Sequence, residues 1–176
     1  MSRRATIGAA ALATLVAGCA AFPETGRNVQ IQRTAHGIAH IEAPDYESLA
    51  YGIAYAHAQD NVCQTANELV TIRGERSRYF GGDGRALLGL RVLPNGQIDL
   101  FVRSHMDDAA LAAAFGKASP DTRAVSRGYV QGYNRFLRDH RDSLPAQCGG
   151  KPWMQPMTLA EYLRLQELTM IQLGVA

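Results

Sequence analysis

The chain has 176 residues, of which 47% are hydrophobic and 19% are charged, which is typical of one globular domain with its own core. The formal net charge is only +2, and two of the basic residues, Arg3 and Arg4, lie at the extreme N-terminus. Without them 16 basic residues face 16 acidic ones. No basic stripe remains, so nucleic acid is excluded as a partner.

The N-terminus is predicted to be an export signal. Two arginines precede an apolar run of small residues at positions 6–17, which is too short to span a bilayer as a helix. Residues 16–19 read Val-Ala-Gly-Cys and resemble a bacterial lipobox, in which the thiol of Cys19 is lipidated and this residue becomes the new N-terminus. The alternative is an ordinary secretory signal that is cut after Ala20.

Both alternatives imply export, and we therefore expect a periplasmic protein whose only contact with the membrane is a lipid anchor on Cys19. The expected organisation is a leader at 1–19, a linker at 20–28 and one domain at 29–176. Export also places the cysteines in an oxidising compartment. If Cys19 is lipidated, Cys63 and Cys148 remain as a pair and are expected to form a disulfide; the alternative is two buried free thiols.

The first half of the domain begins with a predicted β-hairpin. Residues 29–34 and 38–43 are strand-like and flank the turn residues Ala-His-Gly. Asp45 is a predicted N-cap for an apolar helical stripe that runs to Val70, with a longer gap at Asp60 that indicates one bent helix or two consecutive helices. Glycines at 81–84 break the pattern, residues 85–95 show no firm period, and 94–96 read as a turn.

The second half is predicted to be helical. Short helices are expected at 98–105 and 107–115, and Ser119 caps a longer helix that ends near residue 140. A loop at 144–156 precedes a capping box formed by Thr158 and Glu161. The last helix is apolar nearly all round, which predicts that it is buried. The predicted fold is therefore mainly α with one N-terminal hairpin. An isolated two-stranded hairpin is marginally stable in water, and the sequence offers no later element to cover the last helix. Both features indicate a missing partner.

The usual catalytic patterns are absent from the sequence. It has no nucleophile elbow, phosphate loop, dinucleotide fingerprint or Cys-x-x-Cys. His36 and His40 are separated by a turn and have no carboxylate at ligand spacing, so neither a metal site nor a cofactor is expected. Asp107 and Asp108 are predicted to lie at the start of a helix. They are not expected to form an acid/base pair, because adjacent residues on a helix point in different directions.

Three sequence blocks resemble the penicillin acylase family. Residues 33–41 read Arg-Thr-Ala-His-Gly-Ile-Ala-His-Ile and are similar to the family's opening hairpin, Arg-Asp-x-x-Gly-Val-Pro-His-Ile. Residues 51–60, Tyr-Gly-Ile-Ala-Tyr-Ala-His-Ala-Gln-Asp, match its Tyr-Gly-x-x-x-Ala-x-Ala-Gln-Asp helix. Residues 73–81, Arg-Gly-Glu-Arg-Ser-Arg-Tyr-Phe-Gly, look like the branch that contains N-acyl-homoserine lactone and aculeacin A acylases. Thr34 and Ala39 depart from the family's Asp and Pro, which affects the hairpin rather than the chemistry.

The resemblance implies the α-chain part of an αββα N-terminal-nucleophile hydrolase that cleaves the amide bond of a small acylated substrate. In such enzymes the precursor cuts itself, and the catalytic Ser becomes the first residue of a β chain, whose free α-amino group is the general base. No catalytic residue of the family maps onto this chain, which stops at positions 174–176, within or just before the family's cleavage segment. The resemblance also implies an α-chain disulfide that involves Cys63 and Cys148, and acyl contacts from Met170 and Leu173.

Plain core packing is the alternative role for Met170 and Leu173. For the whole chain two alternatives to an acylase remain open. One is a catalytically inactive, truncated lipoprotein with a structural or binding role, and the other is an unrelated helical periplasmic module.

Overall fold

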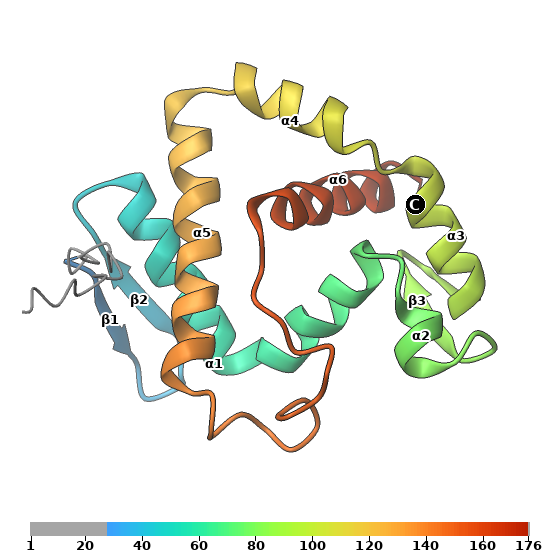
Figure 1. Ribbon diagram of the computed structural model, residues 1–176. Helices are drawn as coiled ribbons and strands as arrows, with labels where there is room; N and C mark the ends of the chain where they lie inside the picture. Colours follow the sequence, from blue (N-terminus) through green and yellow to red (C-terminus); the bar gives the residue numbers. More distant parts are fainter. Residues whose placement is uncertain (1–27, 176) are drawn as a thin grey trace, which may run out of the picture.

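The structure is a computed structural model that describes residues 28–175, and it is mainly helical (Figure 1). The predicted leader, its Cys19 and most of the linker lie outside the described residues. None of the helices within 28–175 is long and apolar enough to cross a membrane. The elements in chain order are β1 Gln30–Arg33, β2 Ala39–Glu42, α1 Tyr46–Ile72, α2 Arg76–Phe80, β3 Arg85–Leu88, β4 Arg91–Pro94, α3 Asn95–His105, α4 Asp108–Lys117, α5 Pro120–Asp139 and α6 Leu159–Val175.

The predicted N-terminal hairpin is confirmed and packs on the first half of α1. Strands β1 and β2 pair antiparallel, with Gln30 opposite Glu42 and Arg33 opposite Ala39. The Arg33 guanidinium donates to the Asp60 carboxylate at 3.0 Å and to the Gln59 side chain at 2.9 Å, which fastens the hairpin to the helix.

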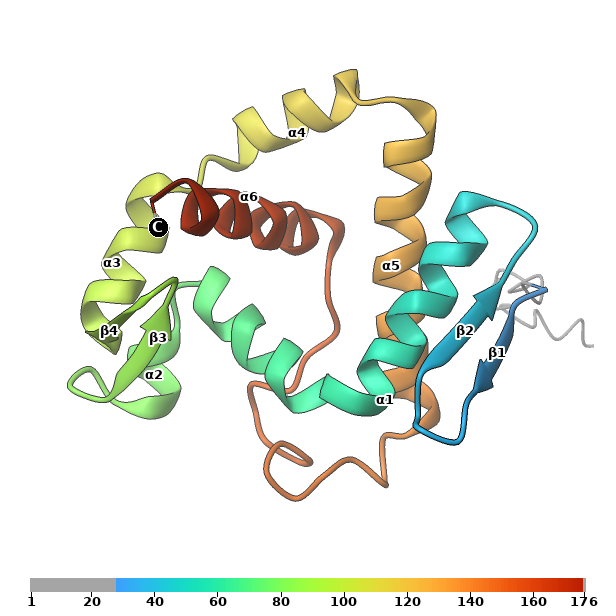
Figure 2. The same ribbon diagram turned by 180° about the vertical axis from the view of Figure 1, so that it is seen from behind.

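Helix α1 is one long helix with a bend. Asp45 is its N-cap, as predicted, and accepts a hydrogen bond from the backbone N–H of Ser48 at 2.7 Å. Asn61 has non-helical dihedrals, φ −134° and ψ 24°, next to the gap in the apolar stripe at Asp60. The first half of α1 therefore runs beside α5, whereas the second half turns away toward α2 and the strand β3 (Figure 2).

The core lies between α1 and α5, which form the most extensive helix pair. Ala54 and Ala58 of α1 are buried against Tyr133 and Phe136 of α5. The Ser119 cap of α5 is confirmed, since its hydroxyl accepts the N–H of Thr122 at 3.1 Å. Small residues on α1 let the bulky rings of α5 approach its backbone.

A second hairpin, β3–β4, occupies residues for which no strand was expected. Its register pairs Leu87 with Val92 and Leu88 with Arg91, so Gly89 and the residue after it form the turn, with Gly89 at φ +60°. The predicted turn at 94–96 is also wrong, because Asn95 begins α3 and donates its N–H to the Gly84 carbonyl at 2.7 Å.

The last helix, α6, begins at the predicted capping box. The N–H of Thr158 donates to Glu161 at 2.7 Å and the N–H of Glu161 donates back to the Thr158 hydroxyl at 3.2 Å. Within residues 28–175 the helix is covered on one side only, and its burial by a partner stays a prediction. Leu168 is buried, but Met170 is 66% and Leu173 is 71% exposed, because α1, α4 and α5 contact only part of the helix.

Candidate functional site: a cavity beside the disulfide

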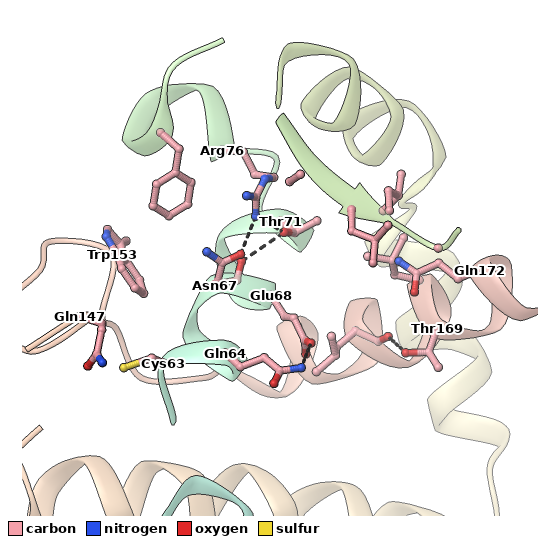
Figure 3. Close-up of a pocket in the computed structure, with 17 residues that line it drawn as sticks. Cys63, Gln64, Asn67, Glu68, Thr71, Arg76, Gln147, Trp153, Thr169 and Gln172 are labelled. Atoms are coloured by element: carbon pink, nitrogen blue, oxygen red, sulfur yellow. Dashed lines mark hydrogen bonds between the residues drawn. The ribbon is translucent and has the colours of Figure 1, made fainter. Parts of the chain in front are cut away.

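A cavity of about 710 Å³ lies where several parts of the chain meet. They are the second half of α1, the hairpin strand β3, the loop that carries Trp153, and α6 (Figure 3), and the short helix α2 adds Arg76 and Phe80 as a fifth part. Its lining is half polar and half apolar in character. The lining residues that the argument uses are Asn67, Glu68, Thr71, Arg76, Phe80, Leu88, Trp153, Leu165, Leu168 and Thr169.

A disulfide between Cys63 and Cys148 closes one end of the cavity. The two Cα atoms are 5.4 Å apart, and the cysteines are separated by 85 positions in the sequence. Cys63 follows the bend at Asn61 by two residues, and Cys148 is fully buried. The bond therefore fixes the loop that carries Trp153 against the bent part of α1.

Arg76 forms the polar end of the cavity although it is only 7% exposed. Its Nη1 donates to the Asn67 side-chain oxygen at 2.6 Å and to the Thr71 hydroxyl at 2.9 Å, and its Nε donates to the Asn95 side-chain oxygen at 2.9 Å. These three acceptors are neutral. The remaining amino group, Nη2, has no hydrogen-bond partner among residues 28–175 and is left as a donor.

The surroundings of Arg76 act on its charge in two opposite directions. Burial lowers the pKa of this guanidinium from its ordinary value, and the nearby Asp99 carboxylate opposes that shift. Asp99 itself is buried and accepts the backbone N–H groups of Arg76 and Ser77, each at 2.8 Å. Because an arginine in a protein stays protonated, the cavity keeps a positive group at one end.

Aromatic and aliphatic side chains form the rest of the wall. The Arg76 guanidinium lies over the Phe80 ring at 5.1 Å, and that ring meets Trp153 edge-on at a centroid distance of 5.7 Å. One face of α6 also lines the cavity, through side chains spaced three and four residues apart: Leu165, Leu168, Thr169 and Gln172.

The structure does not place Met170 or Leu173 in this cavity. Both lie on other sides of α6 and are exposed, whereas Thr169 and Gln172 from the same turns line the wall. Sequence reasoning therefore missed the cavity-facing residues of the last helix. The available signal was the 73–81 block, which belonged to the resemblance but had been given no role.

The hydroxyl groups that line the cavity are engaged by backbone carbonyls. The Thr71 hydroxyl donates to the Asn67 backbone carbonyl at 3.1 Å and the Thr169 hydroxyl donates to the Leu165 carbonyl at 2.9 Å, so neither proton is held by a base. Across residues 28–175 no three His, Cys, Asp or Glu side chains are grouped to hold a metal ion. The lining combines the Arg76 guanidinium, the Glu68 carboxylate and apolar side chains of β3 and α6, a mixture that suits an elongated molecule with polar and apolar parts.

The family model for penicillin amidase matches residues 28–173. The chain belongs to this family. It is 39% identical over 170 residues to the acyl-homoserine lactone acylase PvdQ of Pseudomonas putida, a match that covers 95% of this chain and 22% of that protein. It is 36% identical over 148 residues to the aculeacin-A acylase of Actinoplanes utahensis, covering 82% of this chain and 19% of that protein.

The fold is also similar to a solved member of the family. The thermostable penicillin G acylase from Alcaligenes faecalis superposes with a TM-score of 0.67 at 25% identity, covering 82% of this chain and 72% of that one. The family match, the two sequence relatives and this fold similarity confirm the resemblance to the penicillin acylase family. The chain spans about a fifth of the length of the two acylases matched by sequence.

Proposed function

We propose that this chain is the α-chain part of an acylase that hydrolyses the amide bond of N-acylated substrates, N-acyl-homoserine lactones or related acyl amides. The observation that carries the proposal is the 39% identity to an acyl-homoserine lactone acylase over 95% of the chain. The rest of the polypeptide, a β chain, completes an αββα fold and supplies the nucleophile.

The chemistry follows from the family's mechanism as implied by the sequence resemblance. An N-terminal Ser of the β chain attacks the acyl carbonyl, and its own α-amino group, with an ordinary pKa of about 8, accepts the hydroxyl proton. Backbone donors on the β chain hold the oxyanion. The present chain contributes binding: the wall made by Leu88, Leu165 and Leu168 suits an acyl chain, and the Arg76 end suits a carbonyl oxygen.

The decisive experiment starts from the natural reading frame that contains these 176 codons. We expect codon 176 to be followed by an open frame that reaches a Ser and then a long β-rich segment. Expression of the whole frame should give two chains after processing, and the product should release free homoserine lactone from acylated substrate. A stop codon directly after Ala176, with a folded chain that lacks hydrolysis, would instead support the inactive lipoprotein.

We further propose that the protein is periplasmic and held to the membrane through lipid on Cys19. The support is the lipobox-like run at 16–19. Changing Cys19→Ala should move the protein out of the membrane fraction or block its processing. A wild-type protein that is already soluble and begins at Ala21 or later would contradict the anchor but not the export.

A further inference from the structure

A second hollow lies at the end of α6 that is remote from its capping box, between that end, helix α3 and the turn of the β3–β4 hairpin (Figure 2). It has a volume of about 690 Å³, and we call it the α3–α6 groove. Its apolar lining consists of Leu88, Leu90, Leu93, Phe101 and Ile171. Phe101 and Ile171 are only half-buried, so the groove is open to a partner.

The hairpin beside the groove is apolar on both of its faces. The strand register pairs Leu87 with Val92 and, one residue further along, Leu88 with Arg91, so the two pairs project from opposite faces. Leu88 packs against the main core, whereas Leu87 and Val92 are 67% and 54% exposed. Leu90, in the turn, is 83% exposed. We call Leu87, Leu90 and Val92 the hairpin surface. A short sheet with one buried face would carry polar residues on the other, so this surface marks an interaction site.

The arrangement of these two features restricts the kind of partner. Leu87 and Val92 project from one face of the hairpin, and the groove opens on the other, where Leu88 and Leu93 line it. A flat partner reaches only one of these faces. A polypeptide that folds around the tip of the hairpin reaches both, and it can also place a segment in the groove. The apolar character of the two features suits the centre of such a protein interface.

The end of α6 lies at the same place. Ile171 and Gln172 line the groove, Leu173 is 71% exposed, and a Cβ on Gly89 of the hairpin turn would lie 3.7 Å from the Gln172 side chain. In the acylase proposed above, the polypeptide that follows α6 starts beside the groove, and its covalent link to this chain before processing raises its local concentration there. Because this chain spans about a fifth of the length of the two acylases matched by sequence, the remainder of such a polypeptide is large enough to cover both features.

On the basis of the function proposed above, we propose that the β chain clasps the β3–β4 hairpin. One apolar segment of the β chain lies in the α3–α6 groove, and a second part covers Leu87 and Val92 on the opposite face. The hairpin is then the element through which the α chain holds its partner. The first hairpin, which carries Ile38, lies at the other end of the molecule and outside this contact (Figure 2).

The first test is carbene footprinting of the processed enzyme made from the complete reading frame. The reagent labels exposed side chains, and mass spectrometry locates the label. In this chain alone Ile38, at 62%, is as exposed as Leu87 and Val92. In the assembled enzyme we expect strong labelling of the peptide that contains Ile38 and weak labelling of residues 87–92.

The second test measures how firmly the α chain is held. With the β chain fixed to a support and the same moderate urea concentration throughout, Leu87→Ser with Leu90→Ser should release the α chain at least about tenfold faster, since one buried leucine contact corresponds to about a tenfold change. Ile38→Ser is the matched control and should leave the rate of release unchanged. The three positions are exposed in this chain, so peptide mapping should still show the Cys63–Cys148 link. If the double variant is not processed, the footprint of the wild-type enzyme decides.

Equal labelling of residues 87–92 and of Ile38 in the processed enzyme would overturn the proposal, as would a double variant that is processed and released at the wild-type rate. Equal acceleration by Ile38→Ser would show that the effect is not specific to the hairpin surface. Protection that appears only as the protein concentration rises would identify a second copy of this chain as the occupant. A complete reading frame that yields no second chain contradicts the proposed function itself, whereas a processed, active enzyme with an exposed hairpin contradicts this contact alone.

Discussion

Gly132 of α5 lies so close to Tyr51 of α1 that a Cβ on the glycine would be 2.1 Å from the Tyr51 carbonyl oxygen. Gly128, one turn earlier, has the same relation to Glu47, at 2.0 Å. Both obstacles are backbone atoms, which cannot rotate away. Gly132→Ala should therefore push the two helices apart and lower the free energy of unfolding by about 1–3 kcal/mol, measured by denaturant unfolding.

Gly116→Ala is the matched control, because this glycine also lies in a helix, α4, but has open space around its Cβ position. The control should be neutral or stabilising by about 0.5–1 kcal/mol through helix propensity. If both substitutions changed the free energy of unfolding by the same amount, the close approach of the two helices at Gly132 would have no effect on stability.

The disulfide should make a large contribution to stability. Closing 85 residues between Cys63 and Cys148 corresponds to about 4–5 kcal/mol in the chain-entropy account. The double change Cys63→Ala and Cys148→Ala, or addition of reductant, should lower the unfolding midpoint accordingly. Peptide mapping without reduction should give one linked peptide; free alkylation of both thiols in the folded protein would show that the pair is not oxidised.

Ionisation of Glu161 should make the free energy of unfolding of the domain depend on pH in the acidic range. Burial alone would raise the pKa of this carboxyl, but hydrogen bonds from Arg73 and Thr158 outweigh it and hold the pKa below its ordinary value. The stability gained is therefore present above about pH 4.5 and is lost as the pH falls through the lowered pKa. Glu161→Gln should cost about 1–3 kcal/mol at neutral pH and flatten the decline between about pH 5 and 3.

A second ion pair provides the comparison for Glu161. Asp60 pairs with Arg33 at 3.0 Å, but its side chain is 55% exposed. Asp60→Asn should therefore change stability by no more than about 1 kcal/mol. An equal loss from both variants would mean that the partial burial of the Glu161 pair has no energetic consequence.

Met170 tests the predicted acyl contact. Because it is exposed, Met170→Ala should alter the unfolding of this domain by less than about 0.5 kcal/mol, whereas Leu168→Ala, at a buried position, should cost about 2–5 kcal/mol. If Met170 contacts the acyl chain once the β chain is present, kcat/KM should shift between short- and long-chain N-acyl-homoserine lactones by about 10–200-fold at most. Unchanged ratios would leave Thr169, which lines the cavity, as the position to substitute next.

The features that could be predicted from the sequence are those decided within one helical turn. The caps at Asp45, Ser119 and Thr158 each depend on a side chain that reaches an N–H three residues ahead, and all three are present. The bend in α1 was also visible, because the apolar stripe is interrupted at Asp60, next to the non-helical Asn61.

The features that were missed leave no regular apolar pattern in the sequence. The β3–β4 hairpin has no alternation because Leu87 and Val92 are apolar on its exposed face. The cavity draws residues from five segments between Cys63 and Gln172, and no local pattern in the sequence predicts that these segments meet. The apolar residues around α6 predicted burial, but they do not indicate which side of the helix packs against this domain.

The bond between Cys63 and Cys148 encloses helices α2 to α5 in one covalent ring. A single cut of the backbone inside that ring leaves every piece attached to the same molecule. Helix α4 has no buried residue and is the natural place for a protease to cut. A chain nicked there would migrate as one species until it is reduced, and its two halves would stay together at the cavity. In a compartment that contains secreted proteases, the domain would therefore tolerate a cut that would separate the same fold without the bond.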